Sequence, residues 1–169
     1  MILRGTSCLL LIWFTIAVAL LASLIKMPES MAAYIPNYVV MVLLYWVMAT
    51  PEKVNVGTGW ITGLFMDLLL GSTLGIHAAL MAFVVWMVAG MFSNSRYYSL
   101  IQKTIVVGTV NFIGQFLFYW VEHIFGLVSV NYDNLWSGFA TVILWPVTYV
   151  ILNFLYSTVK PHERYVDYE

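Results

Sequence analysis

Two carboxylic acids lie inside apolar stretches of this chain, where placing an ionisable side chain costs free energy. Asp67 belongs to the apolar run Trp60–Leu70, and Glu122 to the apolar segment 104–128. An acid within a membrane helix usually faces protein or water and marks a functional site. It can exchange protons, bind a polar solute, or hold helices together through hydrogen bonds, and the two residues alone leave these roles open.

Asp67 shares a helix face with glycines. Gly59, Gly63, Asp67 and Gly71 follow one another at intervals of four, which aligns them on one side of a helix. A Gly-x-x-x-Gly pair lets a second helix approach closely, so Asp67 is expected to point at protein rather than lipid. If Asp67 only supports packing, an Asp67→Asn variant, which keeps the shape and much of the hydrogen-bonding capacity, should be tolerated.

A second polar face is predicted in the segment that carries Glu122. Asn111, Gln115 and Glu122 are related by four and seven residues, which is not a pattern for a lipid-facing surface. Asp67 lies about 6 Å before the turn at Gly71, and Glu122 about 10 Å before Ser129, by helical rise. We therefore expect both acids near one crevice in the outer half of the protein.

The residues that catalysis would need do not accompany these acids. The sequence has no metal-ligand cluster, and Gly57-x-Gly59-x-x-x-Gly63 lacks the spacing of a dinucleotide-binding loop. His77 stands alone, and since metal sites need three or four ligands, it is expected to be a hydrogen-bonded structural residue. We predict a protein without catalytic residues, cofactor or metal.

Composition predicts an integral membrane protein of the all-α class. Of 169 residues, 62% are hydrophobic and 9% charged, and a net charge of −1 offers no footprint for nucleic acid. We expect one domain, 1–169, in which six transmembrane helices form one bundle. The predicted spans are 8–25, 31–49, 57–71, 74–92, 104–128 and 135–156, followed by a tail, 157–169.

The second and third spans are short. The second reaches across a bilayer only if 31–35 joins Tyr38–Ala49 across a kink at Pro36, or if the bilayer thins. Short segments interrupted by Gly and Pro resemble the broken helices that line cavities in transporters. The alternative is a pair of tilted helices joined by a partly embedded loop.

Basic residues predict the orientation. With six spans and the N-terminus inside, six of the seven basic residues fall on one side, which is cytoplasmic by the positive-inside rule. Both termini are then cytoplasmic. The inner residues are Arg4, Lys53, Arg96, Lys103, Lys160 and Arg164, and the outer one is Lys26.

One block of sequence is characteristic of a family. Val54–Gly75, with Asn55, Gly57, Gly59, Gly63 and Asp67 inside it, resembles the signature of the bacterial rod shape-determining MreD family in its proteobacterial form. The resemblance extends over essentially the whole chain. The candidate packing or partner-binding positions that it implies are Pro36, Asn37, Pro51, Asn55, Gly57, Gly59, Gly63, Asp67, Gly71, Ser72, Gly75, Trp145 and Pro146.

The resemblance implies an inner-membrane scaffold of the cell-elongation machinery that helps to maintain rod shape. Such proteins associate with MreC, a bitopic protein, and link MreB filaments to peptidoglycan synthesis by RodA and a class B penicillin-binding protein. The fold is expected to resemble the substrate-binding components of energy-coupling-factor transporters. Residue chemistry alone leaves a scaffold, a small-molecule binding protein and a carrier of lipid-linked substrate open, and the resemblance favours the scaffold.

Overall fold

A computed structural model describes residues 2–25, 28, 34–92, 98–124 and 134–159. The side chains of residues 2–6, Glu122, Asn134 and Leu135 are also outside the description. The predictions that concern Lys26, residues 31–33, Arg96 and the tail from Lys160 onward therefore lie outside the described residues, as does any contact of the Glu122 side chain.

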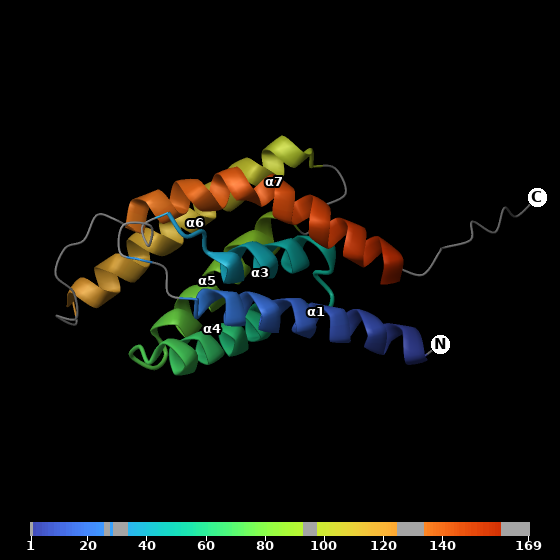
Figure 1. Cartoon of the computed structure of the whole chain (residues 1–169), viewed down its shortest axis with the longest axis horizontal. Helices are drawn as coiled ribbons and strands as arrows, with labels where there is room; N and C mark the ends of the chain where they lie inside the picture. The colour runs from blue at the N-terminus through green and yellow to red at the C-terminus, as the bar shows by residue number, and fades with distance from the viewer. Residues whose placement is uncertain (1, 26–27, 29–33, 93–97, 125–133, 160–169) are drawn as a thin grey trace, which may run out of the picture.

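The described chain is helical, and its helices run back and forth along one long axis (Figure 1). The start of α1 and the end of α7 lie at the same end of the molecule, and the α4–α5 turn lies at the opposite end (Figure 1). The helices are α1 (Ile2–Ser23), α3 (Tyr38–Ala49), α4 (Val56–Leu70), α5 (Ile76–Met91), α6 (Leu100–Ile124) and α7 (Asn134–Val159).

The shortest helix, α3, is the most enclosed. It packs against α1, α5 and α7, and nine of its twelve residues are buried. A helix that is apolar on all sides belongs in a protein interior. At about 18 Å by helical rise, α3 is shorter than the hydrocarbon core of a bilayer. Its neighbours shield it, so its own length need not match the membrane.

One buried polar contact ties α3 to α1. The indole Nε1 of Trp46 donates to Thr15 Oγ1 at 2.8 Å, and Thr15 Oγ1 in turn donates to the carbonyls of Leu11 and Ile12. Both Thr15 and Trp46 are buried. Apolar neighbours offer no hydrogen-bond acceptor to the buried indole N–H of Trp46, and Thr15 supplies one.

The outward faces of the other helices are strongly apolar. Large hydrophobic side chains remain exposed on each of them, for example Phe14, Leu68, Trp86, Phe116 and Ile143. Soluble monomers rarely expose contiguous apolar patches beyond a few hundred Å², so this distribution is typical of lipid-facing helices. Within the described residues, two helices are long and apolar enough to cross a membrane, Leu100–Val121 and Trp136–Val159. The shorter apolar helices there are Ser7–Ser23, Tyr38–Ala49, Val56–Leu70 and Ile76–Met91.

Helix ends differ from the predicted spans at several places, and α1, for example, begins at Ile2 rather than Cys8. Tyr34–Asn37 are non-helical and α3 begins at Tyr38 with Asn37 as its N-cap, while residues 31–33 of the possible continuation across Pro36 lie outside the described residues. Helix α6 begins at Leu100 rather than Thr104. Ser99 and Gln102 cap each other's backbone, with Ser99 N–H to Gln102 Oε1 at 2.9 Å and Gln102 N–H to Ser99 Oγ at 3.3 Å.

Candidate functional site: a capped helical hairpin and the pocket beside it

Helix α4 begins with a capping box made by the family-like residues. Asn55 Oδ1 accepts from the backbone N–H groups of Gly57 and Thr58, and Thr58 Oγ1 accepts from the N–H of Asn55. The first N–H groups of a helix have no partner within the helix, so these bonds fix where α4 starts. The turn before it, Pro51–Lys53, is exposed, as expected of a loop.

The glycine face of α4 packs on α5 of the same chain. A Cβ added to Gly59 would lie 2.7 Å from Val85 Cγ2 and 2.9 Å from the carbonyl O of Met81. A Cβ at Gly63 would lie 2.5 Å from Ala78 Cα and would also collide with the backbone of His77. The glycines therefore form the close seam of a helical hairpin. The helix that packs against them is α5 of the same chain, not a helix of another protein.

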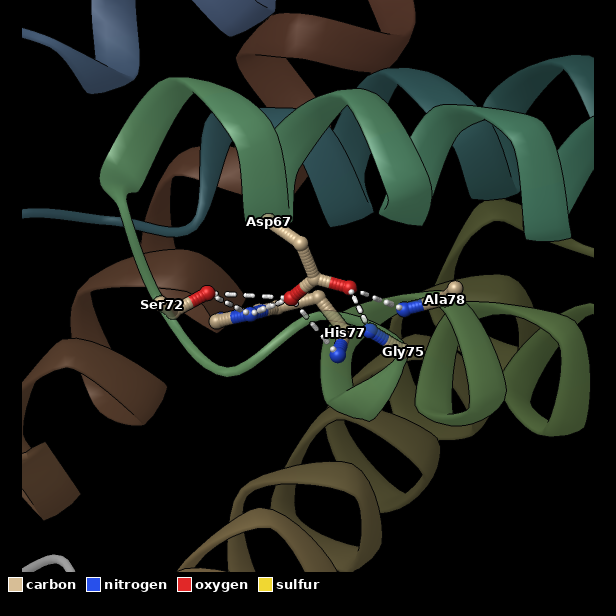
Figure 2. A network of polar contacts seen from close by, with 5 residues as sticks. All are labelled: Asp67, Ser72, Gly75, His77 and Ala78. Carbon is tan, nitrogen blue, oxygen red and sulfur yellow. Dashed lines mark hydrogen bonds and ion pairs between the residues drawn. The ribbon is translucent and has the colours of Figure 1, made fainter.

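Asp67 lies at the closed end of this seam and bonds to the start of α5 (Figure 2). Its Oδ2 accepts from the backbone N–H groups of Gly75 at 2.8 Å and Ala78 at 3.3 Å. Its Oδ1 accepts from the backbone N–H of His77 at 3.1 Å, the Ser72 hydroxyl at 3.0 Å and the ring Nδ1 of His77 at 2.7 Å. Five donors thus converge on one carboxylate.

Through these contacts Asp67, a residue of α4, acts as the N-cap acceptor for α5. Gly75, at the N-cap position of α5, has no side chain to accept from the first turn. Asp67 supplies that acceptor from α4, and its negative charge faces the positive end of the α5 dipole. Since an ionised carboxylate only accepts hydrogen bonds, it matches a set made entirely of donors.

Two glycines make the intervening turn possible. Gly71, the C-cap of α4, has φ +65°, and Gly75 has φ +100°, both in the left-handed region that side chains disfavour. Neither would meet any atom with an added Cβ, so backbone conformation alone requires glycine there. The spacing Gly71–Gly75 therefore sets the turn that brings Ser72 and His77 to Asp67.

A cavity of about 380 Å³ lies beside this hairpin, between α5, α6 and the first turns of α3 and α7. His77 is part of its wall, and Phe118 contacts the His77 ring with centroids 4.6 Å apart. The lining residues are Asn37, Val40, His77, Leu80, Met81, Val84, Asn111, Gly114, Gln115, Phe116, Phe118, Tyr119 and Ser137.

Two of the three residues of the polar face predicted on α6 can be placed relative to this pocket. Asn111 and Gln115 line it, together with Asn37 at the start of α3. Asn37 Oδ1 caps α3 at the N–H of Val40, while its own N–H donates to Thr141 on α7 at 2.9 Å. The motif residue Asn37 thus fixes the rim of the pocket.

Of the two acids of the expected crevice, Asp67 can be placed, whereas the Glu122 side chain lies outside the described residues. Asp67 is 1% exposed and does not line the pocket, because His77 stands between the acid and the cavity and its other donors surround it. In the sixth predicted span, Trp145 is fully buried, whereas Pro146 is exposed in the middle of α7.

Sequence reasoning treated His77 as separate from Asp67, and the structure joins them. The sequence feature that could have indicated this contact is Gly75 at the start of α5. Because glycine has no side chain to cap the helix, the first turn of α5 needs an acceptor from another part of the chain. The interpretation of His77 as a hydrogen-bonded residue agrees with this contact. Among the described residues, no group of three His, Cys, Asp or Glu side chains could hold a metal ion.

Fold and surface together define an all-helical membrane protein whose most distinctive sequence block forms one capped hairpin. The family model of the rod shape-determining protein MreD matches residues 4–155, and the chain belongs to this family. It is 32% identical over 154 residues to the rod shape-determining protein MreD of Haemophilus influenzae, covering 89% of this chain and 95% of that one. No solved structure matches the chain. The family supports a role in determining rod shape.

Proposed function

We propose that this protein is a non-enzymatic scaffold in the inner membrane, where it helps to couple an MreC-like protein and MreB to peptidoglycan synthesis by RodA and a class B penicillin-binding protein. All six helices are then embedded as one bundle, similar to substrate-binding components of energy-coupling-factor transporters. Both termini face the cytoplasm. Contact with MreC is direct, through helix faces.

The observation that carries this proposal is that the contacts of the family-like residues lie within one helical hairpin. Asn55, Gly63 and Asp67 all build the α4–α5 hairpin, and the polar groups of Asp67, Ser72 and His77 at its turn bond to one another. A rigid hairpin with apolar outer faces suits a protein that presents helices to other membrane proteins. Trp60 and Trp86, on the outer faces of α4 and α5, are about half or more exposed and supply such surface.

Site-specific photocrosslinking tests the partnership. A photoreactive phenylalanine analogue is placed at Trp60, Trp86 or Phe154, all exposed, and at Leu43, which is fully buried in α3. The cells lack the native protein, so that only variants restoring rod shape are scored. We expect an exposed position to crosslink an MreC-like protein and Leu43 to give none. If every shape-restoring exposed variant fails to crosslink MreC, direct contact through these faces is wrong.

A further inference from the structure

The pocket beside the hairpin contains a buried amide that the fold does not use. Asn111, midway along α6, is 2% exposed and lines the pocket, and no hydrogen bond joins its side chain to a described residue. Among the described residues, the enclosed side-chain atoms without a partner are Tyr45 Oη and Trp145 Nε1, so the Asn111 amide reaches the cavity. Its backbone belongs to the helix, so the amide is the part that can meet a ligand. Buried polar groups are nearly always satisfied, and each exception calls for an explanation.

The rest of the lining defines what could satisfy that amide. No described residue in the wall carries an Asp, Glu, Lys or Arg side chain, and His77 is already bonded to Asp67. Within the part of the wall that the structure describes, a charged ligand would lose its hydration without gaining a counter-ion. The rings of Phe118 and Tyr119 are part of the wall and favour a flat apolar body.

The size of the cavity limits which ligands can fit in the pocket. At about 380 Å³ it lies in the lower part of the range for small-molecule sites, which are mostly apolar with a few placed polar groups. From His77 to Val84 it extends along about two turns of α5, or roughly 10 Å by helical rise. That length suits a compact molecule better than an extended lipid chain.

We propose that this pocket binds a small neutral molecule with an amide-like head on a flat apolar body, and that Asn111 recognises the head by a paired donor and acceptor. A primary amide fits because it offers one of each to the complementary groups of Asn111. This binding is separate from the scaffold role and does not depend on the partners proposed above.

The test uses one ring with different heads. Binding of 4-fluorobenzamide, 4-fluorotoluene and 4-fluorobenzoate to the purified full-length protein in nanodiscs is measured by fluorine NMR, with empty nanodiscs to correct for partition into lipid. We expect the amide to bind about four- to a hundredfold more tightly than the toluene, because each bond of the pair contributes about two- to tenfold. The benzoate should bind more weakly than the amide.

Variants locate the site. Asn111→Leu should remove the preference for the amide while leaving 4-fluorotoluene binding, and Leu80→Trp, which fills the pocket, should abolish both. Asn153→Leu makes the same change on the exposed face of α7 and should alter nothing. Unchanged melting temperatures confirm that the variants are folded. Equal affinity for amide and toluene in the native protein, a preference that survives in Asn111→Leu, or tighter benzoate binding would each overturn the proposal.

Discussion

Asp67 Oδ2 lies 2.8 Å from the backbone nitrogen of Gly75, so an acid near the end of α4 accepts the N–H of the residue at the N-cap position of α5. The two residues are eight positions apart, and the bond closes the turn between their helices. Because Oδ1 also gathers three donors, the carboxylate fixes both the angle of the turn and the start of α5. The family-like block Val54–Gly75 therefore contains α4, its capping residues and the turn into α5, which are parts of one hairpin.

Asp67→Asn should destabilise the protein, contrary to what the sequence alone suggested for a packing residue. An amide has one acceptor oxygen, so its NH₂ group must face either the Gly75 and Ala78 N–H groups or the three donors at Oδ1. Buried donors left unpaired cost about 1–3 kcal/mol each. We expect a lower melting temperature in detergent and less protein in membranes, approaching the loss in Asp67→Leu.

The matched control for this prediction is Leu68→Asn, which places the same amide on the exposed neighbour. It removes no donor partner and should affect stability less than Asp67→Asn. If Asp67→Asn melts like the native protein, the carboxylate is not needed as an acceptor of all five bonds.

Gly63→Ala should destabilise the hairpin, because its new methyl group would collide with the backbone of α5 at His77 and Ala78. Backbone yields less than a side chain tip, and overpacking of this kind typically costs about 1–3 kcal/mol. Gly90→Ala is the control, since Gly90 is a helical glycine with open space around it. There alanine should be neutral or stabilising by up to about 1 kcal/mol. Similar melting temperatures for both variants would show that the seam can open without cost.

Much of this hairpin could be predicted from residue spacing. The interval of four between Gly59, Gly63 and Asp67 indicated a close helix seam facing protein, and the charged turn at Pro51–Lys53 lies where expected. The spacing could not say that the facing helix is α5, because small residues mark close approach and not the identity of the neighbour. Nor could it place Asn111 beside His77, which depends on how α5 and α6 cross.

Thr15→Val should weaken the contact between α1 and α3. Valine keeps the shape but removes the oxygen that accepts from Trp46 Nε1, leaving an N–H unpaired in the interior, at about 1–3 kcal/mol. Thr109→Val is the control, because the exposed Thr109 hydroxyl only returns to its own helix at the Ile105 carbonyl. A fall in melting temperature is expected for the first variant alone, and equal effects would mean that the Trp46 bond adds nothing to stability.

The proposed orientation makes opposite predictions for the two ends of α4. Glu52, in the turn before α4, and Thr73, in the turn after it, are both exposed, and they lie at opposite ends of that helix. The excess of basic residues puts the Glu52 end in the cytoplasm. With buried Cys8 changed to alanine, cysteines at these two positions are the only thiols in their respective variants. A membrane-impermeant maleimide added to intact spheroplasts should label Thr73→Cys and spare Glu52→Cys until the membrane is opened. Labelling of Glu52→Cys in intact spheroplasts, with Thr73→Cys protected, would reverse the orientation. Labelling of both would place α4 on one side of the membrane instead of across it.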